Sequence, residues 1–300
     1  MNYIAEIEMD GERIDKCIPL FCENLSRSYA SKLIKDGLVL VNGKQVKASF
    51  VLSEGDEVSF DVPPAQMPQI EPENIPLDIL YEDGDVIVVN KPKGMVVHPA
   101  AGHYSGTLVN ALMYHCGDSL SGINGVLRPG IVHRIDMDTT GSVIACKNDK
   151  AHDSIALQLK EHSVKRLYRA ICCGVIKDDE GVIETNIGRS SSDRKKMAVV
   201  PVGSGKSAVT HYKVLKRFDK YTYVECRLET GRTHQIRVHM THIGHPLLGD
   251  TVYGNQKSPF KLTGQCLHAY YLGFEQPTTG EYVETVAPLP EYFSHLLEIL

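Results

Sequence analysis

The sequence contains no apolar run as long as the roughly 18 to 20 residues that a membrane-spanning helix needs. Its first residues, MNYIAEIEMD, are acidic and lack the apolar core of a secretion signal. None of the eight cysteines forms a C-x-x-C pair or belongs to a regular framework, which predicts reduced and mostly buried thiols. Together these absences predict a cytoplasmic protein with no membrane partner.

Motifs for nucleotide cofactors and for metal-dependent hydrolysis are also missing, since neither G-x-x-x-x-G-K-[ST] nor G-x-G-x-x-G nor H-E-x-x-H occurs. His239, His242 and His245 recur at a spacing that can bring two imidazoles onto one helical face, but Gly244 ends the helix before the third. Because no cysteine pair lies near them, we expect solvated or buried histidines, no metal and no cofactor. A metal hydrolase that uses His239 and His242 remains an alternative.

Charge is segregated along the chain, although the net charge is −5. Residues 160–217 hold thirteen Lys and Arg against six Asp and Glu, and residues 26–47 hold five against Asp36 alone. The acidic residues concentrate elsewhere. Such segregation is typical of a nucleic-acid-binding surface on an otherwise acidic protein, although solvated helix faces produce similar runs.

With 42% hydrophobic residues, the chain has apolar material for one large domain and a small one. Residues 1–62 predict a small α/β module with two helices, the second capped by Ser26, and a hairpin at Asn42-Gly43. Five prolines then follow between positions 63 and 76, which predicts a linker over residues 63–75.

Residues 76–300 predict the larger domain. Residues 85–92 read as a buried strand that Pro92 ends, and residues 221–229 alternate as a half-buried strand. Helical spacing appears in 148–162 and in 233–244. Because strands outnumber helices and recur with hairpin-like spacing, we expect an α+β fold built on a largely antiparallel, mixed β-sheet with flanking helices.

The stretch HRIDMDTTG, residues 133–141, places charged residues among apolar ones. Asp136 lies between Ile135 and Met137, so we expect it to be partly buried, where a carboxylate needs a cation or hydrogen-bond donors to stay ionised. It can cap a turn with the backbone of residues 139–141. Alternatively, it is an ionised nucleophile or base held by an arginine.

Two basic constellations can supply that arginine or contact an RNA. Arg232 and Arg237 are five residues apart, about 140° around a helix, so one can face a carboxylate while the other faces phosphate. Tyr168 lies on a predicted strand between Arg166 and Arg169. It is either an ordinary strand aromatic or a ring that stacks on a nucleobase.

HRIDMDTTG closely resembles the signature H-R-L-D-x-x-T-S-G of the RluA-type pseudouridine synthases, with Ile135 in place of Leu and Thr140 in place of Ser. Further stretches agree in family order: VVNKPKGMVVHP, KRLYRAICCG, and LETGRTHQIRVHM with GHPLLGDTVYG. The resemblance covers residues 77–290, and residues 1–62 resemble the S4-type RNA-binding module. Within the family, the Pro-linked module and the run SGINGVLRPGIVHRID look most like the branch that acts on large-subunit ribosomal RNA.

The resemblance implies a cofactor-free isomerase that converts uridines in RNA to pseudouridine. It assigns Asp136 as the essential aspartate, acting on the ribose side of the glycosidic bond of a flipped uridine. Tyr168 matches the tyrosine that stacks on the uracil and helps to remove the proton from carbon 5. Arg237 matches the arginine that pairs with the aspartate, and Arg134 the residue that enters the space left by the flipped base.

Further RNA contacts are expected from Arg232 and from Arg27, Lys32 and Lys35 of the small module. Two alternatives stay open beside a synthase acting on ribosomal RNA. One is a tRNA-directed synthase, and the other is a catalytically idle RNA-binding or ribosome-assembly factor on the same scaffold.

Overall fold

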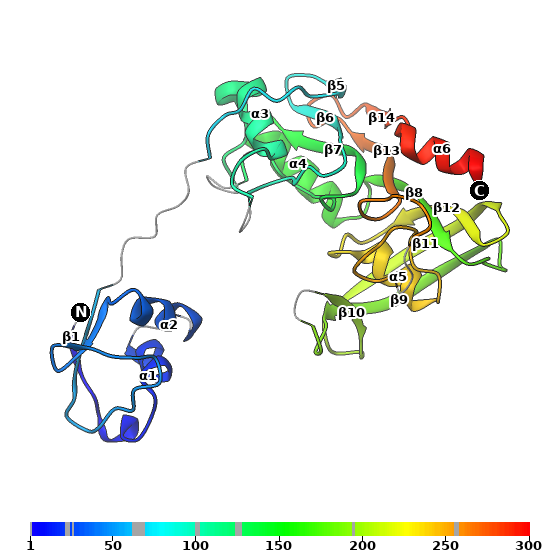
Figure 1. Cartoon of the computed structure of the whole chain (residues 1–300). Helices are drawn as coiled ribbons and strands as arrows, with labels where there is room; N and C mark the ends of the chain where they lie inside the picture. The colour runs from blue at the N-terminus through cyan, green and yellow to red at the C-terminus, as the bar shows by residue number, and fades with distance from the viewer. Residues whose placement is uncertain are drawn as a thin grey trace. The chain divides into compact units, whose positions relative to one another are not determined.

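The structure, a computed structural model (Figure 1), describes residues 2–21, 25, 27–61, 70–99, 103–123, 128–193, 196–254 and 258–300. The predicted cap Ser26, residues 63–69 of the predicted linker and the basic residues 194 and 195 lie outside this described part. The chain divides into two compact units, Met1–Met67 and Pro68–Leu300. None of the described helices is long and apolar enough to cross a membrane.

The smaller unit combines two helices with a four-stranded antiparallel sheet of order β1-β4-β2-β3. Its elements are β1 (Asn2–Ile4), the 3-10 helix η1 (Ile7–Met9), α1 (Ile14–Phe21), α2 (Arg27–Lys35), β2 (Val39–Val41), β3 (Lys44–Gln45) and β4 (Glu57–Phe60). Ile14 and Leu33 are buried in one core cluster with Val58 of the sheet. The hairpin predicted at Asn42-Gly43 is confirmed, because both residues have positive φ, 49° and 74°, between β2 and β3.

The larger unit is built on a ten-stranded mixed sheet of order β10-β9-β11-β12-β8-β13-β7-β6-β5, with β14 paired to β13. The strands are β5 (Ile79–Glu82), β6 (Val86–Lys91), β7 (Thr140–Cys146), β8 (Lys165–Cys173), β9 (Glu180–Arg189), β10 (Met197–Val200), β11 (Lys206–Arg217), β12 (Tyr221–Leu228), β13 (Leu267–Glu275) and β14 (Tyr282–Val286). The helices are α3 (Leu108–Cys116), the 3-10 helix η2 (Gly117–Ser119), α4 (Asp149–Lys160), α5 (Gln235–His242) and α6 (Glu291–Ile299). The predicted α+β class with a largely antiparallel sheet is confirmed, and β7 with β13 is a parallel pair.

Strands β6 and β7 are buried on both faces of the sheet. All seven residues of β7 are buried. Ile87 of β6 packs in one core cluster with Leu108 of α3, whereas Val88 packs in another with Ile155 of α4. Helices α3 and α4 therefore hold β7 from opposite sides (Figure 1), and β7 in turn fixes the loop over residues 133–139 that precedes it.

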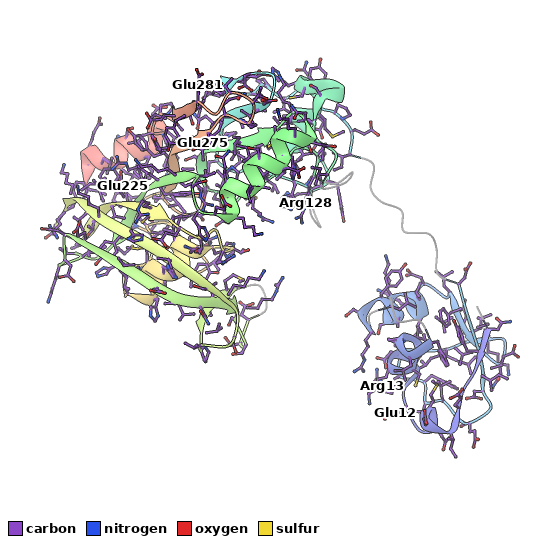
Figure 2. All side chains as sticks on the ribbon, turned by 180° about the vertical axis from the view of Figure 1, so that it is seen from behind. Glu12, Arg13, Arg128, Glu225, Glu275 and Glu281 are labelled. Atoms are coloured by element: carbon purple, nitrogen blue, oxygen red, sulfur yellow. The ribbon has the colours of Figure 1, made fainter. Side chains whose placement is uncertain are left out.

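Side chains alternate along β8 as the strand period requires. Arg166, Tyr168 and Ala170 are buried on one face. Arg169 lies on the other face, where it pairs at 3.0 Å with Glu225 of β12, a residue labelled in Figure 2. The side chains of Arg166 and Tyr168 therefore project from the same face of β8, whereas that of Arg169 projects from the opposite face.

Part of the predicted linker belongs to the larger unit. Ile70 is only 6% exposed and packs in the main core cluster of that unit. The Asn110 side chain donates to the carbonyl of Glu71 at 2.8 Å, and the Glu73 carboxylate accepts from the backbone N–H of Gly106. Residues 70–75 are therefore not a free linker, because an apolar side chain and a buried amide anchor them.

Gly141, the last residue of HRIDMDTTG, lies in β7 opposite Ala269 of the parallel strand β13. Its φ is +107°, and a Cβ at this position would overlap the Ala269 carbonyl and stand 2.8 Å from its backbone nitrogen. The turn of this stretch comes earlier, where the N–H of Thr139 donates to the carbonyl of Asp136. Close approach of two backbones therefore explains the glycine.

We expect Gly141→Ala to destabilise the larger unit by about 3 kcal/mol, because the added methyl forces β7 and β13 apart and strains φ. Urea denaturation measures the change. Gly84→Ala is the matched control, since no described atom lies within 4 Å of the point where its methyl would stand, and should stay within about 0.5 kcal/mol of wild type. A Gly141→Ala protein as stable as this control would contradict the close approach.

Candidate active site

A cavity of about 600 Å³ opens in the larger unit beside the loop that precedes β7. Its walls come from that loop, from α4 and β8, and from residues 228–237 between β12 and α5. The residues predicted as catalytic, Asp136, Tyr168 and Arg237, all line it, and so do Arg134 and Arg232. The fold therefore gathers residues that are up to about a hundred positions apart in the chain.

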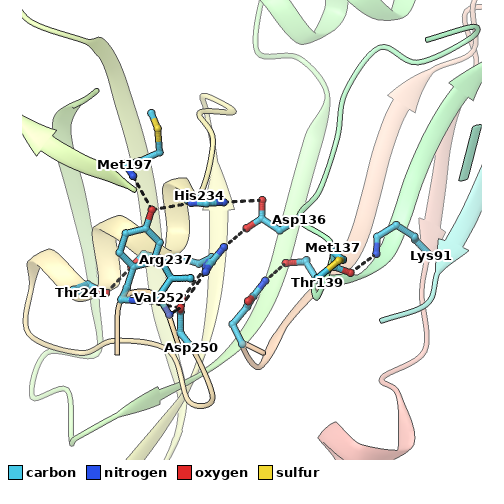
Figure 3. Close-up of polar contacts among 12 residues, drawn as sticks. Lys91, Asp136, Met137, Thr139, Met197, His234, Arg237, Thr241, Asp250 and Val252 are labelled. Carbon is cyan, nitrogen blue, oxygen red and sulfur yellow. Dashed lines mark hydrogen bonds and ion pairs between the residues drawn. The ribbon is translucent and has the colours of Figure 1, made fainter. Parts of the chain in front are cut away.

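The side chain of Asp136 is held by an arginine. Its Oδ2 accepts a hydrogen bond of 2.9 Å from Nη1 of Arg237 (Figure 3), and the side chain is 18% exposed. The N–H of Thr139 donates to the backbone carbonyl of Asp136, whereas the Asp136 carboxylate binds Arg237 and does not cap this turn. Of the two interpretations left open by the sequence, the arginine-held carboxylate is the one that the structure contains.

Arg237 joins Asp136 to a second carboxylate. Its Nε and Nη2 donate to the two oxygens of Asp250 at 2.7 and 3.0 Å, and its guanidinium carbon lies 5.0 Å from the centre of the Tyr253 ring. Burial works against the charge on Arg237, but the hydrogen bonds and charges of Asp250 and Asp136 overcome this and raise its pKa. The cation therefore stays charged inside the protein.

Asp250 is the residue that sequence reasoning missed. Its side chain has no exposed surface, and its Oδ1 also accepts from the backbone N–H groups of Val252 and Tyr253. Burial tends to raise its pKa, but Arg237 and these N–H groups hold the pKa below its usual value. Asp250 belongs to GHPLLGDTVYG, one of the stretches that carry the family resemblance, yet nothing in that stretch indicates its partner thirteen residues earlier.

His234 and Tyr253 form a second contact to the Asp136 carboxylate. The Nε2 atom of His234 lies 3.8 Å from Oδ1 of Asp136, and its Nδ1 lies 2.7 Å from the Tyr253 hydroxyl. That hydroxyl accepts from the N–H of Met197 at 2.9 Å and can donate to Nδ1, which directs an Nε2–H toward Asp136. Burial lowers the pKa of His234, and the Asp136 charge acts against this shift.

Lys91 anchors the chain directly after Asp136. The side chain is 1% exposed, and its Nζ donates to three backbone carbonyls, those of Pro92, Met95 and Met137, at 2.8, 2.8 and 2.9 Å. Burial lowers its pKa to about 7, while the charges of Asp138 and Asp136 act in the opposite direction. Three bonds from one ammonium fix the backbone position of Met137, and with it that of Asp136.

Tyr168 points from β8 into the cavity and is 7% exposed. Burial raises its pKa, Arg166 opposes that shift and Asp136 adds to it. The phenol is therefore neutral at neutral pH. The ring offers a flat apolar face to whatever the cavity binds.

The two arginines expected to contact RNA lie at different depths. Arg134 is exposed, and its Nη1 lies 3.4 Å from Nε2 of the buried His98, whose pKa burial lowers to about 4. Arg232 is half-buried and donates from Nε to the carbonyl of Ser207 at 2.8 Å. The helical spacing assumed for Arg232 and Arg237 is wrong, because α5 begins only at Gln235 and both arginines line the same cavity.

The cations predicted in the smaller unit are all exposed on α2. Lys32 and Lys35 lie in its last turn. Arg27 is 54% exposed but pairs at 3.1 Å with the buried Asp15, which also binds Arg13, a residue labelled in Figure 2. Arg27 therefore shares its charge with a carboxylate of its own unit, whereas Lys32 and Lys35 have no carboxylate partner within 4 Å among the described residues.

His239, one of the three histidines that suggested a metal site, binds two threonines. His239 is fully buried in α5, with Nδ1 2.9 Å from the Thr210 hydroxyl and Nε2 2.9 Å from the Thr185 hydroxyl. Both ring nitrogens are therefore engaged by threonines. Within the described ranges, no group of three or more His, Cys, Asp or Glu side chains is arranged to hold a metal ion.

Comparison with known proteins matches each of the two units to a family. Residues 85–242 match the family model for RNA pseudouridylate synthase, and residues 24–58 match the S4 domain. The chain is 54% identical to an uncharacterised RNA pseudouridine synthase of Bacillus subtilis, YlyB, over 100% of this chain and 99% of that protein. It is 46% identical to the ribosomal large subunit pseudouridine synthase D of Zymomonas mobilis, over 98% and 95%. The solved structure of human RNA pseudouridylate synthase domain containing 1 has a TM-score of 0.59 at 26% identity, covering 76% of this chain and 95% of that one.

Replacing Arg237 by Met leaves Asp250 buried without its cation. We expect a loss of about 3 to 5 kcal/mol in the free energy of unfolding at pH 7. In wild type the pKa of Asp250 lies below its usual value of 3.8, so its stabilising contribution is complete above that pH and is lost as the pH falls. In the variant only the N–H groups of Val252 and Tyr253 still oppose burial, so the pKa of Asp250 rises above its wild-type value and the penalty grows as the pH rises.

The gap in urea stability between wild type and Arg237→Met should therefore narrow from pH 7 to pH 4. Arg227→Met is the control for the substitution, because Arg227 and its partner Glu229, 3.8 Å away, have side chains that are 46% and 39% exposed. It should cost about 1 kcal/mol or less, with little change over the same pH range. A constant gap for Arg237→Met would contradict the coupling of Arg237 to Asp250.

Proposed function

The chain belongs to the RNA pseudouridylate synthase family, and we propose that it isomerises uridines in large-subunit ribosomal RNA to pseudouridine. The family supplies the reaction type. The relative in Zymomonas mobilis, which matches over nearly the whole length, is named for the ribosomal large subunit and supports the choice of RNA. The reaction breaks the bond between N1 of uracil and C1′ of ribose and forms one between C5 and C1′. Because C5 loses a proton and N1 gains one, the sum is an isomerisation without redox change.

Asp136 is proposed as the catalytic carboxylate, and its hydrogen bonding carries this assignment. Arg237 binds Oδ2 and orients the carboxylate by a charge-assisted hydrogen bond. Oδ1 has only the 3.8 Å contact to His234, and Asp136 lines the cavity, so Oδ1 is the oxygen that we assign to act on the ribose. A partly buried carboxylate with one oxygen held and one available is suited to nucleophilic or base chemistry.

Tyr168 is proposed to support the uracil and to handle its proton. The buried ring gives the base an apolar face on which to stack while it is detached from the ribose. A phenol both accepts and donates, so its hydroxyl can receive the C5 proton while passing on its own. Exclusion of water by the bound nucleotide would protect C1′ of the ribose, which water would otherwise attack after the N1–C1′ bond breaks.

Arg134 is proposed to stabilise a uridine turned out of its helix. A nucleobase inside a duplex cannot reach a cavity of this kind without unstacking, which costs a few kcal/mol. Arg134 is exposed beside Asp136 and is steadied by His98. Its guanidinium can fill the space left in the helix or bind phosphate while Asp136 acts on the flipped uridine.

We further propose a cytoplasmic location for the protein and an RNA-binding role for the smaller unit. The seven described cysteines are free thiols, which fits the reducing cytoplasm where ribosomal RNA is processed. The smaller unit, with its match to the S4 domain and its exposed Lys32 and Lys35, is proposed to bind RNA backbone.

Asp136→Asn should abolish turnover, because it keeps the shape of the side chain but removes the charge and most of the nucleophilicity. The measurement is tritium release from RNA that carries uridine labelled at carbon 5. Asp178→Asn makes the same change at an exposed residue outside the cavity lining and should keep activity within about threefold of wild type. Substantial turnover by Asp136→Asn would rule out its role and favour an idle scaffold.

Deleting Met1–Met67 should weaken RNA binding without removing the chemistry, since this unit has its own core and supplies none of the proposed catalytic residues. We expect a smaller slope of log affinity against log salt, by about 0.7 to 0.9 for each phosphate that the deleted unit binds. The single-turnover rate at saturating RNA should change much less. An unchanged salt slope would show that the unit does not bind phosphates, and normal binding with lost chemistry would show that it helps to build the site.

A further inference from the structure

Arg166 is a buried cation whose charge has no carboxylate partner in the described part of the chain. Its side chain is 7% exposed, and its Nη2 donates to the backbone carbonyl of Glu229 at 3.1 Å. Its Nε is buried and has no hydrogen-bond partner among the described residues. Of the Asp and Glu side chains that the structure describes, none has an oxygen within 4 Å of this guanidinium. Buried charges in proteins are otherwise paired, because an unpaired one loses its hydration without compensation.

The surroundings hold the guanidinium in the wall of the active-site cavity. Arg166 lies two residues before Tyr168 on the same face of β8, and both line the cavity. Gly231 faces the guanidinium so closely that a Cβ there would stand 3.0 Å from Nη1. The loop over residues 229–231 therefore wraps the cation with backbone and supplies one neutral acceptor.

Arg166 does not contact the carboxylates of the site. Its charge opposes the raised pKa of Tyr168, and burial lowers the pKa of Arg166 itself. Asp136, Tyr168 and Arg166 all line the same cavity, but no oxygen of Asp136 lies within 4 Å of the Arg166 guanidinium. A nucleotide in this cavity can therefore contact Asp136 and Arg166 through different groups.

We propose that Arg166 binds an anionic oxygen of the nucleotide that occupies this cavity. The inference rests on the proposed function and adds a substrate-binding residue to it. Two groups of a uridine nucleotide provide such an oxygen. A backbone phosphate is charged from the start, whereas a uracil oxygen becomes charged when the N1–C1′ bond breaks and its electron pair leaves with the base.

These two sources differ in when the charge is present. A phosphate interacts equally in the bound complex and in the transition state, so its loss weakens binding. A uracil oxygen carries charge only during the reaction, so its loss slows the chemical step. The salt dependence adds a second distinction, because only phosphate binding releases counterions.

The test compares Arg166→Met with Arg169→Met in the full-length chain. Both remove one arginine from β8, but Arg169 lies on the opposite face and pairs with Glu225. The RNA is unmodified large-subunit ribosomal RNA. Affinity and its salt slope are measured in an Asp136→Asn background, which binds without turnover, and the single-turnover rate is measured with Asp136 intact. Arg166→Gln, which can still donate to the Glu229 carbonyl, replaces Arg166→Met if that variant does not fold.

If phosphate is the partner, Arg166→Met should bind about tenfold more weakly with a salt slope smaller by about 0.7 to 0.9, at a nearly unchanged single-turnover rate. If a uracil oxygen is the partner, Arg166→Met should keep the RNA affinity and the salt slope of wild type, and its single-turnover rate should fall about a hundredfold. Arg169→Met should change neither. Affinity and rate both within about twofold of wild type for Arg166→Met would overturn the proposal, whatever its thermal stability.

The experiment also separates this inference from the proposed function. Wild-type protein must release tritium from the RNA and Asp136→Asn must not. If wild type is inactive on ribosomal RNA, the proposed function fails. If wild type is active and the Arg166 variants match it, the proposed function stands and only the role of Arg166 is lost.

Discussion

The guanidinium of Arg237 hydrogen-bonds to both Asp136 and Asp250, and this cluster of two carboxylates and one cation carries an excess negative charge. Asp250 takes two of the three bonds and is completely buried, so it orients the cation. Asp136 receives the remaining bond and lines the cavity, and its second oxygen has no bond from Arg237. Asp136 is therefore the carboxylate that a ligand can reach. Without Arg237, burial would favour the neutral acid at Asp250, and Asp136 would lose the cation that orients it.

The sheet supports this arrangement from several of its strands. Lys91 at the end of β6 holds the backbone beside Asp136 through three carbonyls, and Gly141 allows β7 to approach β13 closely. Tyr168 projects from β8, two strands away from β7 in the sheet. Side chains on such elements are positioned more accurately than those on free loops, and charge-assisted bonds are sensitive to small displacements. The packing on both faces of β7 thus helps to hold the residues of the cavity in place.

Local patterns predicted the parts of the molecule that local forces determine. The Asn42-Gly43 hairpin and the class of the sheet followed from turn chemistry and residue alternation, and HRIDMDTTG indicated Asp136 because charge and apolar residues meet within a few positions. Long-range pairing left no such local mark, and the pairing of Arg237 with Asp136 was expected only from the family resemblance. Nothing near Asp250 reveals Arg237, and the geometry assumed for Arg232 failed because the helix starts after it. Periodicity cannot locate a helix end that a left-handed residue, here His234, sets.

The parallel pairing of β7 with β13 has a consequence for synthesis. Thr140 and His268 are 128 residues apart, and Asp136 precedes Arg237 by 101. A growing chain therefore exposes one apolar edge of β7 until β13 has left the ribosomal exit tunnel. Pairings of such separation form slowly, and an open strand edge can pair with other chains in the meantime. The sheet around the catalytic cluster is consequently complete only after β13 has emerged, so a prematurely terminated copy that stops before β13 has an incomplete sheet and no stable site.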